Sequence, residues 1–236
     1  LTDAGMCGDY NSVIGMKKEN AILRFFKKKT DRLVPAMEAP TISGIIVEGN
    51  NDTGLAKNIS EGLARNVLSA KFNNQIIETF SPLTEDGQIE LFTWKNEEGK
   101  TAFWHSSAHV LAQAILALYP EAKLTIGPAI ENGFYYDVDF GDHYITEKEL
   151  KDIEKKFLEF ASKKFEFKMR SASKKEALDF YQKKENPYKI ELIENLEDGT
   201  ITFCDHGDFT DLCRGGHMPH TGFIKAVKLL KVAGDY

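Results

Sequence analysis

Cysteine is scarce in this chain, and long hydrophobic runs are missing. The 236 residues contain three cysteines, Cys7, Cys204 and Cys213. Three scattered thiols are too few for a disulfide framework, and they fit a reducing compartment. No apolar run approaches the roughly 20 residues that cross a bilayer, and the first residues do not resemble a signal peptide. These absences predict a cytoplasmic protein that makes no contact with a membrane.

Positive charge is also in short supply. The formal net charge is −6 at pH 7, and 42% of the residues are hydrophobic and 28% charged, which is ordinary for a soluble globular protein. This charge argues against binding nucleic acid through a uniformly basic surface, although a local basic groove is compatible with it. A chain of 236 residues can form one large domain or two modest ones.

The first 98 residues divide into a leader and a small module. Residues 1–40 hold no sustained hydrophobic period, and we expect an atypical, disordered leader. Residues 41–98 predict an α+β module whose strands surround one helix, the layout of a β-grasp domain. Its expected elements are a strand at 42–47, a helix through Leu55, Ile59, Leu63 and Val67, a hairpin at Asn73–Asn74 and a strand at 89–94. The polar stretch 95–100 predicts a linker.

A helix with two histidines on one face is expected over residues 102–119. An apolar stripe with spacings of four and three marks it, formed by Trp104, Ala108, Leu111, Ile115 and Leu118. His105 and His109 are four residues apart, so both project from one face of this helix. More than a hundred residues later, Cys213 and His217 repeat the same spacing beside a Gly-Gly pair.

These two His and Cys pairs suit two kinds of chemistry. Three imidazoles and one thiolate can close a tetrahedron around zinc. The same groups can also serve hydrolysis, as a proton acceptor and as a group that orients water. The residues alone leave both alternatives open.

The other expected elements follow from capping and alternation. Two capping boxes predict helix starts, Thr146 with Glu149 and Ser173 with Glu176. Alternating apolar residues predict strands at 165–169, 188–193 and 201–204. The remaining histidines lie outside the motifs and are expected at the surface, namely His143, His206 and His220.

Three separated motifs resemble one known family. They are WHSSAH at 104–109, IGPAIENGFYYDVDF at 126–140 and DLCRGGH at 211–217. Together they resemble the N-terminal half of bacterial threonyl-tRNA synthetases. Residues 53–98 are similar to that family's leading β-grasp module, called TGS, and the closing LLKVAGDY resembles the segment that joins this half to the catalytic core.

The resemblance implies an α+β protein of two domains. Residues 41–98 would be the TGS-like β-grasp domain, incomplete or altered because only one strand precedes its helix. Residues 100–230 would be an α/β sandwich, the editing domain of the threonyl/alanyl-tRNA synthetase type. Residues 231–236 would begin the linker to an aminoacylation core that the sequence lacks. We find no class II synthetase motif, so we expect no aminoacylation, and the ATP and zinc of that core have no site here.

The function implied is hydrolytic proofreading of Ser-tRNA(Thr). Threonine differs from serine by one methyl, and a binding pocket discriminates a missing methylene by only about 1–3 kcal/mol. A second site must then remove the smaller product. The implied partner is tRNA(Thr) with its 3′-terminal seryl-adenosine, and the full-length family forms homodimers. The alternatives are a non-catalytic tRNA-binding module and a zinc-dependent deacylase that works in trans.

The resemblance also assigns roles to individual residues. His105 would act as base or position the water, and Cys213 would orient water or substrate. Lys189 would offer a cation to the ester and Asp211 would bind the serine ammonium, with His217 completing the catalytic group. The substrate-binding residues would be His109, Tyr135 and Tyr136. The threonyl resemblance favours a metal-free site, whereas related alanyl proofreading domains bind zinc at such a constellation, here His105, His109, Cys213 and His217.

Overall fold

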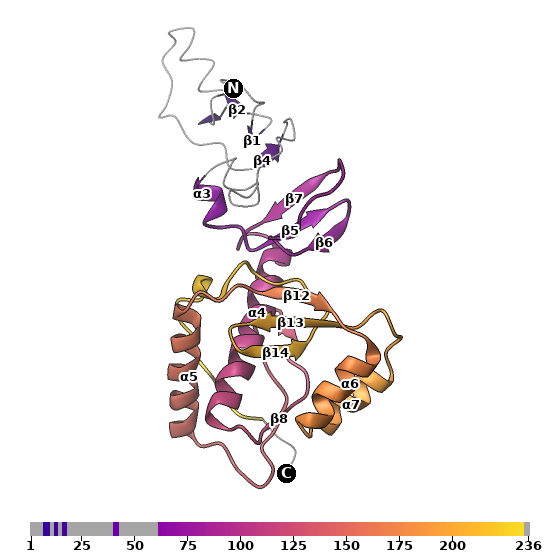
Figure 1. Cartoon of the computed structure of the whole chain (residues 1–236). Coiled ribbons are helices and arrows are strands. Elements are labelled where there is room, and N and C mark those ends of the chain that lie inside the picture. The colour runs from indigo at the N-terminus through magenta and orange to yellow at the C-terminus, as the bar shows by residue number, and fades with distance from the viewer. Residues whose placement is uncertain (1–6, 10–11, 14–15, 18–39, 43–60, 234–236) are drawn as a thin grey trace. The chain divides into compact units, whose positions relative to one another are not determined.

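The computed structural model describes residues 61–233 and four short strands before them (Figure 1). The chain divides into two compact units, Leu1–Glu61 and Gly62–Tyr236. In the first unit β1 (Cys7–Asp9) pairs antiparallel with β4 (Pro40–Ile42), and β2 (Ser12–Val13) pairs with β3 (Met16–Lys17). Most of the strand expected at 42–47 and the start of the following helix lie outside the described residues. Among the described residues, no helix combines the length and apolarity that a membrane span requires.

The second unit begins with a short helix and a small antiparallel sheet. The helix is α3 (Glu61–Ala64), and the sheet has the order β6-β5-β7, with β5 at Ser69–Phe72, β6 at Gln75–Ile77 and β7 at Ile89–Phe92. The predicted hairpin is confirmed, because Asn73 and Asn74 have φ angles of 46° and 66°. Asparagine tolerates this left-handed conformation, which a two-residue hairpin turn needs.

The long helix α4 (Glu97–Leu118) runs through the centre of this unit. It begins inside the stretch 95–100, so the predicted linker is wrong. Gly99 explains the difference, because a Cβ at this position would lie 2.1 Å from the carbonyl oxygen of Thr93. The glycine thus marks close packing of the helix against the end of β7. The predicted stripe is buried at its centre, whereas Leu118 at its end is 39% exposed.

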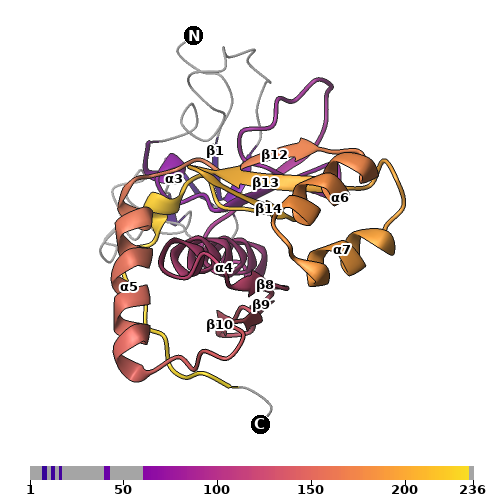
Figure 2. The same cartoon turned by 60° about the horizontal axis from the view of Figure 1, so that its bottom comes forward.

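A second antiparallel sheet covers α4. It has the order β12-β13-β14, formed by β12 (Lys168–Ser171), β13 (Thr202–His206) and β14 (Phe209–Leu212). Figure 2 shows α4 nearly end-on beneath this sheet, with α5 on one side and α6 and α7 on the other. The strand predicted at 201–204 is confirmed, but only the last part of 165–169 is in a strand. The sheet and α4 thus bring two distant stretches of sequence face to face.

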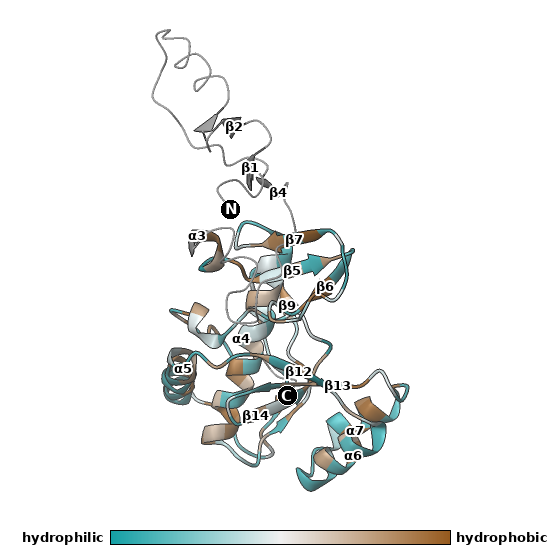
Figure 3. Cartoon of the chain, turned by 45° about the horizontal axis from the view of Figure 1, so that its top comes forward, coloured by the Kyte–Doolittle hydropathy of each residue, from teal (hydrophilic) through white to brown (hydrophobic). Residues whose placement is uncertain are grey.

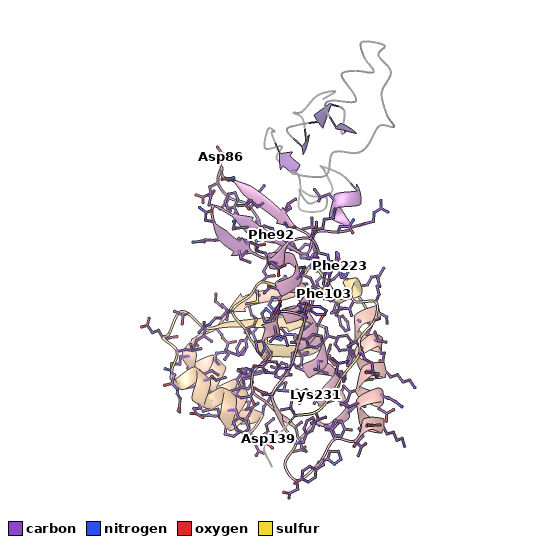
Figure 4. All side chains as sticks on the ribbon, turned by 180° about the vertical axis from the view of Figure 1, so that it is seen from behind. Asp86, Phe92, Phe103, Asp139, Phe223 and Lys231 are labelled. Atoms are coloured by element: carbon purple, nitrogen blue, oxygen red, sulfur yellow. The ribbon has the colours of Figure 1, made fainter. Side chains whose placement is uncertain are left out.

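Helix α5 (Glu147–Ser162) closes the main core. Its predicted capping box is confirmed, because the side chains of Thr146 and Glu149 each bond the other residue's backbone N–H. The outward side of α5 is hydrophilic (Figure 3), while Ile153 and Phe157 are buried against α4. Phe103 of α4 and Phe223, both labelled in Figure 4, also pack against this core.

Two further helices overturn one predicted strand. Helix α6 (Lys174–Lys183) begins at Ser173, whose side chain accepts the Glu176 N–H, and is followed by α7 (Pro187–Glu194). The strand expected at 188–193 is therefore wrong. The Asn186 side chain accepts the Lys189 N–H and Pro187 occupies the first turn, two strong helix-start signals.

The remaining elements are short. They are β8 (Lys123–Leu124) paired with β11 (Val138–Asp139), β9 (Ala129–Ile130) paired with β10 (Gly133–Phe134), and the 3-10 helix η1 (Thr221–Phe223). The described part of the chain therefore has a mixed architecture of helices and small antiparallel sheets. This agrees with the predicted α+β class.

Candidate functional site

Two histidines of α4 meet the segment that follows β14. The sulfur of Cys213 lies 3.3 Å from the Nε2 atoms of His105, His109 and His217. The Nε2 atoms of His105 and His109 are 3.2 Å apart. His109, Cys213 and His217 are buried, and His105 is half-buried. The four residues with metal-ligand or hydrolytic chemistry in the sequence thus form one cluster, which we call the His–Cys cluster.

A turn at Gly215 and Gly216, the glycine turn, brings His217 close to Cys213. Gly215 and Gly216 have φ angles of 92° and 86°, which L side chains rarely adopt. The Gly215 N–H points at the Cys213 sulfur at 3.3 Å. The Met218 N–H donates to the Ser106 hydroxyl at 2.9 Å, which pins the end of the turn to α4. The Gly-Gly pair therefore serves the geometry of the cluster.

A buried ion pair lies beside the His–Cys cluster. The Lys189 ammonium is 2.6 Å from Asp211 Oδ1, and these side chains are 3% and 2% exposed. The Tyr136 hydroxyl donates to Asp211 Oδ2 at 2.5 Å, and Tyr181 donates to Oδ1 at 3.0 Å. The link to the cluster is His109, whose Nδ1 is 3.3 Å from Asp211 Oδ2.

The two neighbouring tyrosines of the predicted pocket separate in the structure. Tyr136 faces the ion pair, whereas Tyr135 is 43% exposed. Adjacent residues of an extended chain point to opposite sides, so only one of the two can face inward. The second tyrosine that contacts Asp211 is Tyr181 of α6, for which the sequence carries no recognisable signal.

Charge is redistributed within the His–Cys cluster. Burial alone would raise the pKa of the Cys213 thiol, but His109 and the hydrogen bonds from the imidazoles hold it well below its usual range. Burial lowers the pKa of His217, yet contacts with Cys204, Cys213 and Glu78 raise it well above normal. Asp211 keeps a low pKa against its burial because Lys189 and His109 face it. These directions favour a thiolate at Cys213 that accepts hydrogen bonds from the surrounding imidazoles, an arrangement that can orient water.

The residue types of the cluster also suit a zinc ion. The four ligand atoms lie within 4.8 Å of one another. Nitrogen ligands about 2.0 Å from zinc would be about 3.3 Å apart in a tetrahedron, close to the 3.2 Å between His105 and His109. Carboxylates face the outer nitrogens of His109 and His217, as is common around zinc-binding histidines. The donor set is therefore suited to this metal.

His206 was expected at the surface, and this expectation is wrong. The residue is 1% exposed, and its ring centroid is 4.9 Å from that of Phe167 and 5.0 Å from that of Phe209. Alternation along β13 explains this, because His206 shares the inner face with Cys204. His143 is exposed as expected, and His220 is half-buried, with its side chain accepting the Gly222 N–H.

Replacing His206 should change how stability depends on pH. Burial lowers the pKa of His206 to about 3, and neither ring nitrogen has a partner among the described residues. Below the unfolded pKa of about 6.5, the unfolded chain takes up a proton that the folded chain excludes, so stability falls. Between pH 7.5 and pH 5.0, we expect the unfolding free energy of His206→Phe to gain about 2 kcal/mol relative to wild type.

Urea unfolding of both proteins at the two pH values measures this difference. A constant offset between the proteins would report packing of the larger ring, and only the change with pH reports His206. A change with pH of less than about 0.5 kcal/mol would contradict the exclusion of the proton.

Comparisons with known proteins give two family matches. Residues 201–235 match the model described as the threonyl and alanyl tRNA synthetase second additional domain. Residues 1–61 match the model described as YmdB-like protein. The first match includes β13, β14 and the Cys213–His217 half of the cluster.

Curated relatives extend the first match. A threonine–tRNA ligase of Flavobacterium johnsoniae is 63% identical over 189 residues, which is 80% of this chain and 29% of the relative. That of Flavobacterium psychrophilum is 60% identical over 182 residues, 77% of this chain and 28% of the relative. That of Cytophaga hutchinsonii is 54% identical over 189 residues, which is 80% of this chain and 29% of the relative.

This chain is a homologue of threonine–tRNA ligases over four fifths of its length. The resemblance read from the three sequence motifs is thereby confirmed. The chain spans about 29% of the relatives' own length. Residues 201–235 match the synthetase second-additional-domain model, whereas the first 61 residues match a different model. The predicted leader of residues 1–40, which departs from the family's usual start, falls inside that second match.

Proposed function

We propose that residues 100–230 form an editing domain that hydrolyses Ser-tRNA(Thr). The observation that carries this proposal is the convergence of Cys213 with His105, His109 and His217, in a chain homologous to threonine–tRNA ligases. Hydrolysis of an aminoacyl ester needs an oriented water, a proton acceptor and a stabilised oxyanion. The His–Cys cluster offers the first two, and the nearby cation of Lys189 suits the third.

The exposure of each residue supports a division of roles. His105 is the half-buried member of the cluster, so it is the imidazole best placed to meet water and the ester. Cys213 and His217 lie behind it and would orient that water. Lys189 and Asp211 now bind each other. A substrate ammonium at Asp211, or an oxyanion at Lys189, would therefore have to join or replace that contact.

Hydrolysis of Ser-tRNA(Thr) beside Thr-tRNA(Thr) by the full chain tests the proposal. We expect the seryl ester to be cleaved at least about 10-fold faster, because the extra methyl of threonine must be rejected by shape. Loss of the radiolabelled amino acid from each tRNA measures both rates. Equal rates would contradict the size selection, and rates equal to spontaneous hydrolysis would contradict the activity itself.

A zinc-dependent deacylase acting in trans is the second candidate. The fit of His105, His109, Cys213 and His217 to a tetrahedral site favours it. A bound zinc ion would supply a Lewis acid and an activated water. Metal analysis of protein purified without chelator separates the candidates, since one zinc per chain supports this one. The non-catalytic tRNA-binding module instead predicts no turnover of either ester.

A further inference from the structure

A carboxylate outside the sequence motifs contacts the His–Cys cluster. Glu78 follows β6 directly, and its Oε1 lies 3.2 Å from His217 Nδ1. The same carboxylate accepts the Gly216 N–H at 2.8 Å and the His217 N–H at 3.3 Å. One side chain thus binds the backbone of the glycine turn and the imidazole that the turn delivers.

The glycine turn is shaped around this carboxylate. A Cβ added to Gly215 would lie 3.0 Å from Glu78 Oε1, and its φ of 92° is already unfavourable for other residues. A side chain there would crowd the acceptor as well as strain the backbone. Glycine is therefore favoured at this position for two reasons, the backbone conformation and the close approach of the Glu78 carboxylate.

The two nitrogens of His217 face different partners. Nε2 lies 3.3 Å from the Cys213 sulfur, and Nδ1 faces Glu78. A carboxylate only accepts hydrogen bonds, so Nδ1 carries the proton and Nε2 is directed at the sulfur. Cys204 is the other group near Nδ1, at 3.8 Å. Burial raises the pKa of its thiol to about 11, so it stays neutral and is a weaker acceptor than a carboxylate.

We propose that Glu78 is a positioning residue, which keeps a proton on His217 Nδ1 and fixes the orientation of the ring, and thereby the place of the Cys213 sulfur. The consequence for rate rests on the proposed deacylase function, but the consequence for the imidazole does not. The same contact would orient His217 if its Nε2 bound a metal. Because Glu78 follows β6 directly, the end of that strand contributes to the geometry of the editing site.

Two variants of Glu78 distinguish loss of the hydrogen-bond acceptor from loss of the negative charge alone. Glu78→Ala removes the acceptor, whereas Glu78→Gln keeps one amide oxygen that can still accept from His217 Nδ1. Glu90→Ala is the matched control, since Glu90 lies in the same sheet and pairs with Lys71 at 2.8 Å. Thermal unfolding of each full-length variant establishes that it is folded.

Nitrogen-15 NMR of histidine-labelled full chain is the deciding measurement. The His217 signals are assigned by their loss in His217→Gln. In the wild type, in Glu78→Gln and in Glu90→Ala, we expect Nδ1 of His217 to have the shift of a protonated ring nitrogen. In Glu78→Ala this signal should move toward that of an unprotonated ring nitrogen. An unchanged Nδ1 signal in folded Glu78→Ala would overturn the proposal.

Deacylation kinetics give an independent second measurement. We expect kcat for Ser-tRNA(Thr) to fall about 10–100-fold in Glu78→Ala, as for loss of other groups that orient a functional imidazole. KM should change little, and Glu78→Gln should recover most of the rate. Equal rates in the wild type and Glu78→Ala would refute the link between His217 orientation and turnover. Absence of deacylation in the wild type would refute the proposed function, while the NMR result would still decide the role of Glu78.

Discussion

Lys189→Met should lower the free energy of unfolding by about 3–5 kcal/mol, the usual cost of leaving a buried charge without its partner. The Lys189 ammonium and the Asp211 carboxylate are 2.6 Å apart and almost fully buried. Methionine has a similar length and adds no polar group, so lost packing contributes little. Asp211 would keep its tyrosine hydrogen bonds but lose its counter-ion. Urea unfolding monitored by circular dichroism measures the change.

Removing the charge of Asp211 as well tests whether the broken ion pair causes this loss of stability. In Lys189→Met/Asp211→Asn neither charge remains, so the double variant should be at least about 1 kcal/mol more stable than the sum of the single changes implies. Lys156→Met is the matched control, because Lys156 pairs with Glu159 in solvent and such pairs contribute about 0–1 kcal/mol. A loss in Lys189→Met no larger than in the control would show that Lys189 is not a buried counter-ion.

The halves of the His–Cys cluster were readable from sequence because each depends on local spacing. His105 with His109, and Cys213 with His217, share one face through a four-residue interval. Their meeting is not local, since α4 and the end of β14 are separated by about a hundred residues and by the helices α5, α6 and α7. The family resemblance supplied that link, and the measured distances agree with it.

Conflicting local signals explain two wrong predictions near the site, the strand at 188–193 and the linker at 95–100. Tyr188 to Ile193 alternates like a strand, but Asn186 and Pro187 start a helix, and that helix buries Lys189. The polar stretch 95–100 looked like a linker, whereas it contains the start of α4, where Gly99 allows close packing against Thr93.

Other features depend on contacts that no sequence pattern records. Glu78 belongs to no recognisable motif, and its contact with His217 spans 139 positions. His206 is one of several histidines without a motif, and only its strand alternation with Cys204 indicates burial. Recognising either would require knowing which strands adjoin the cluster.

Cys213→Ala should lower the rate of Ser-tRNA(Thr) hydrolysis by about 100-fold or more, the range over which a positioned acid or base contributes. The sulfur lies 3.3 Å from all three imidazole Nε2 atoms, so its removal leaves His105, His109 and His217 without this common partner. His105→Ala should cause a loss of similar size, because His105 is the imidazole that water can reach. Single-turnover hydrolysis with excess protein measures both rates.

The double variant shows whether these two residues act together. If Cys213 and His105 form one unit, Cys213→Ala/His105→Ala should be little slower than either single variant, since effects within a catalytic unit are not additive. His143→Ala is the control, because this exposed histidine pairs with Glu149 away from the cluster, and it should keep the wild-type rate. Filter binding of tRNA(Thr) to each variant shows whether a lower rate of hydrolysis reflects weaker binding of the tRNA. If Cys213→Ala and His105→Ala hydrolysed Ser-tRNA(Thr) as fast as the wild type, the His–Cys cluster would have no part in turnover.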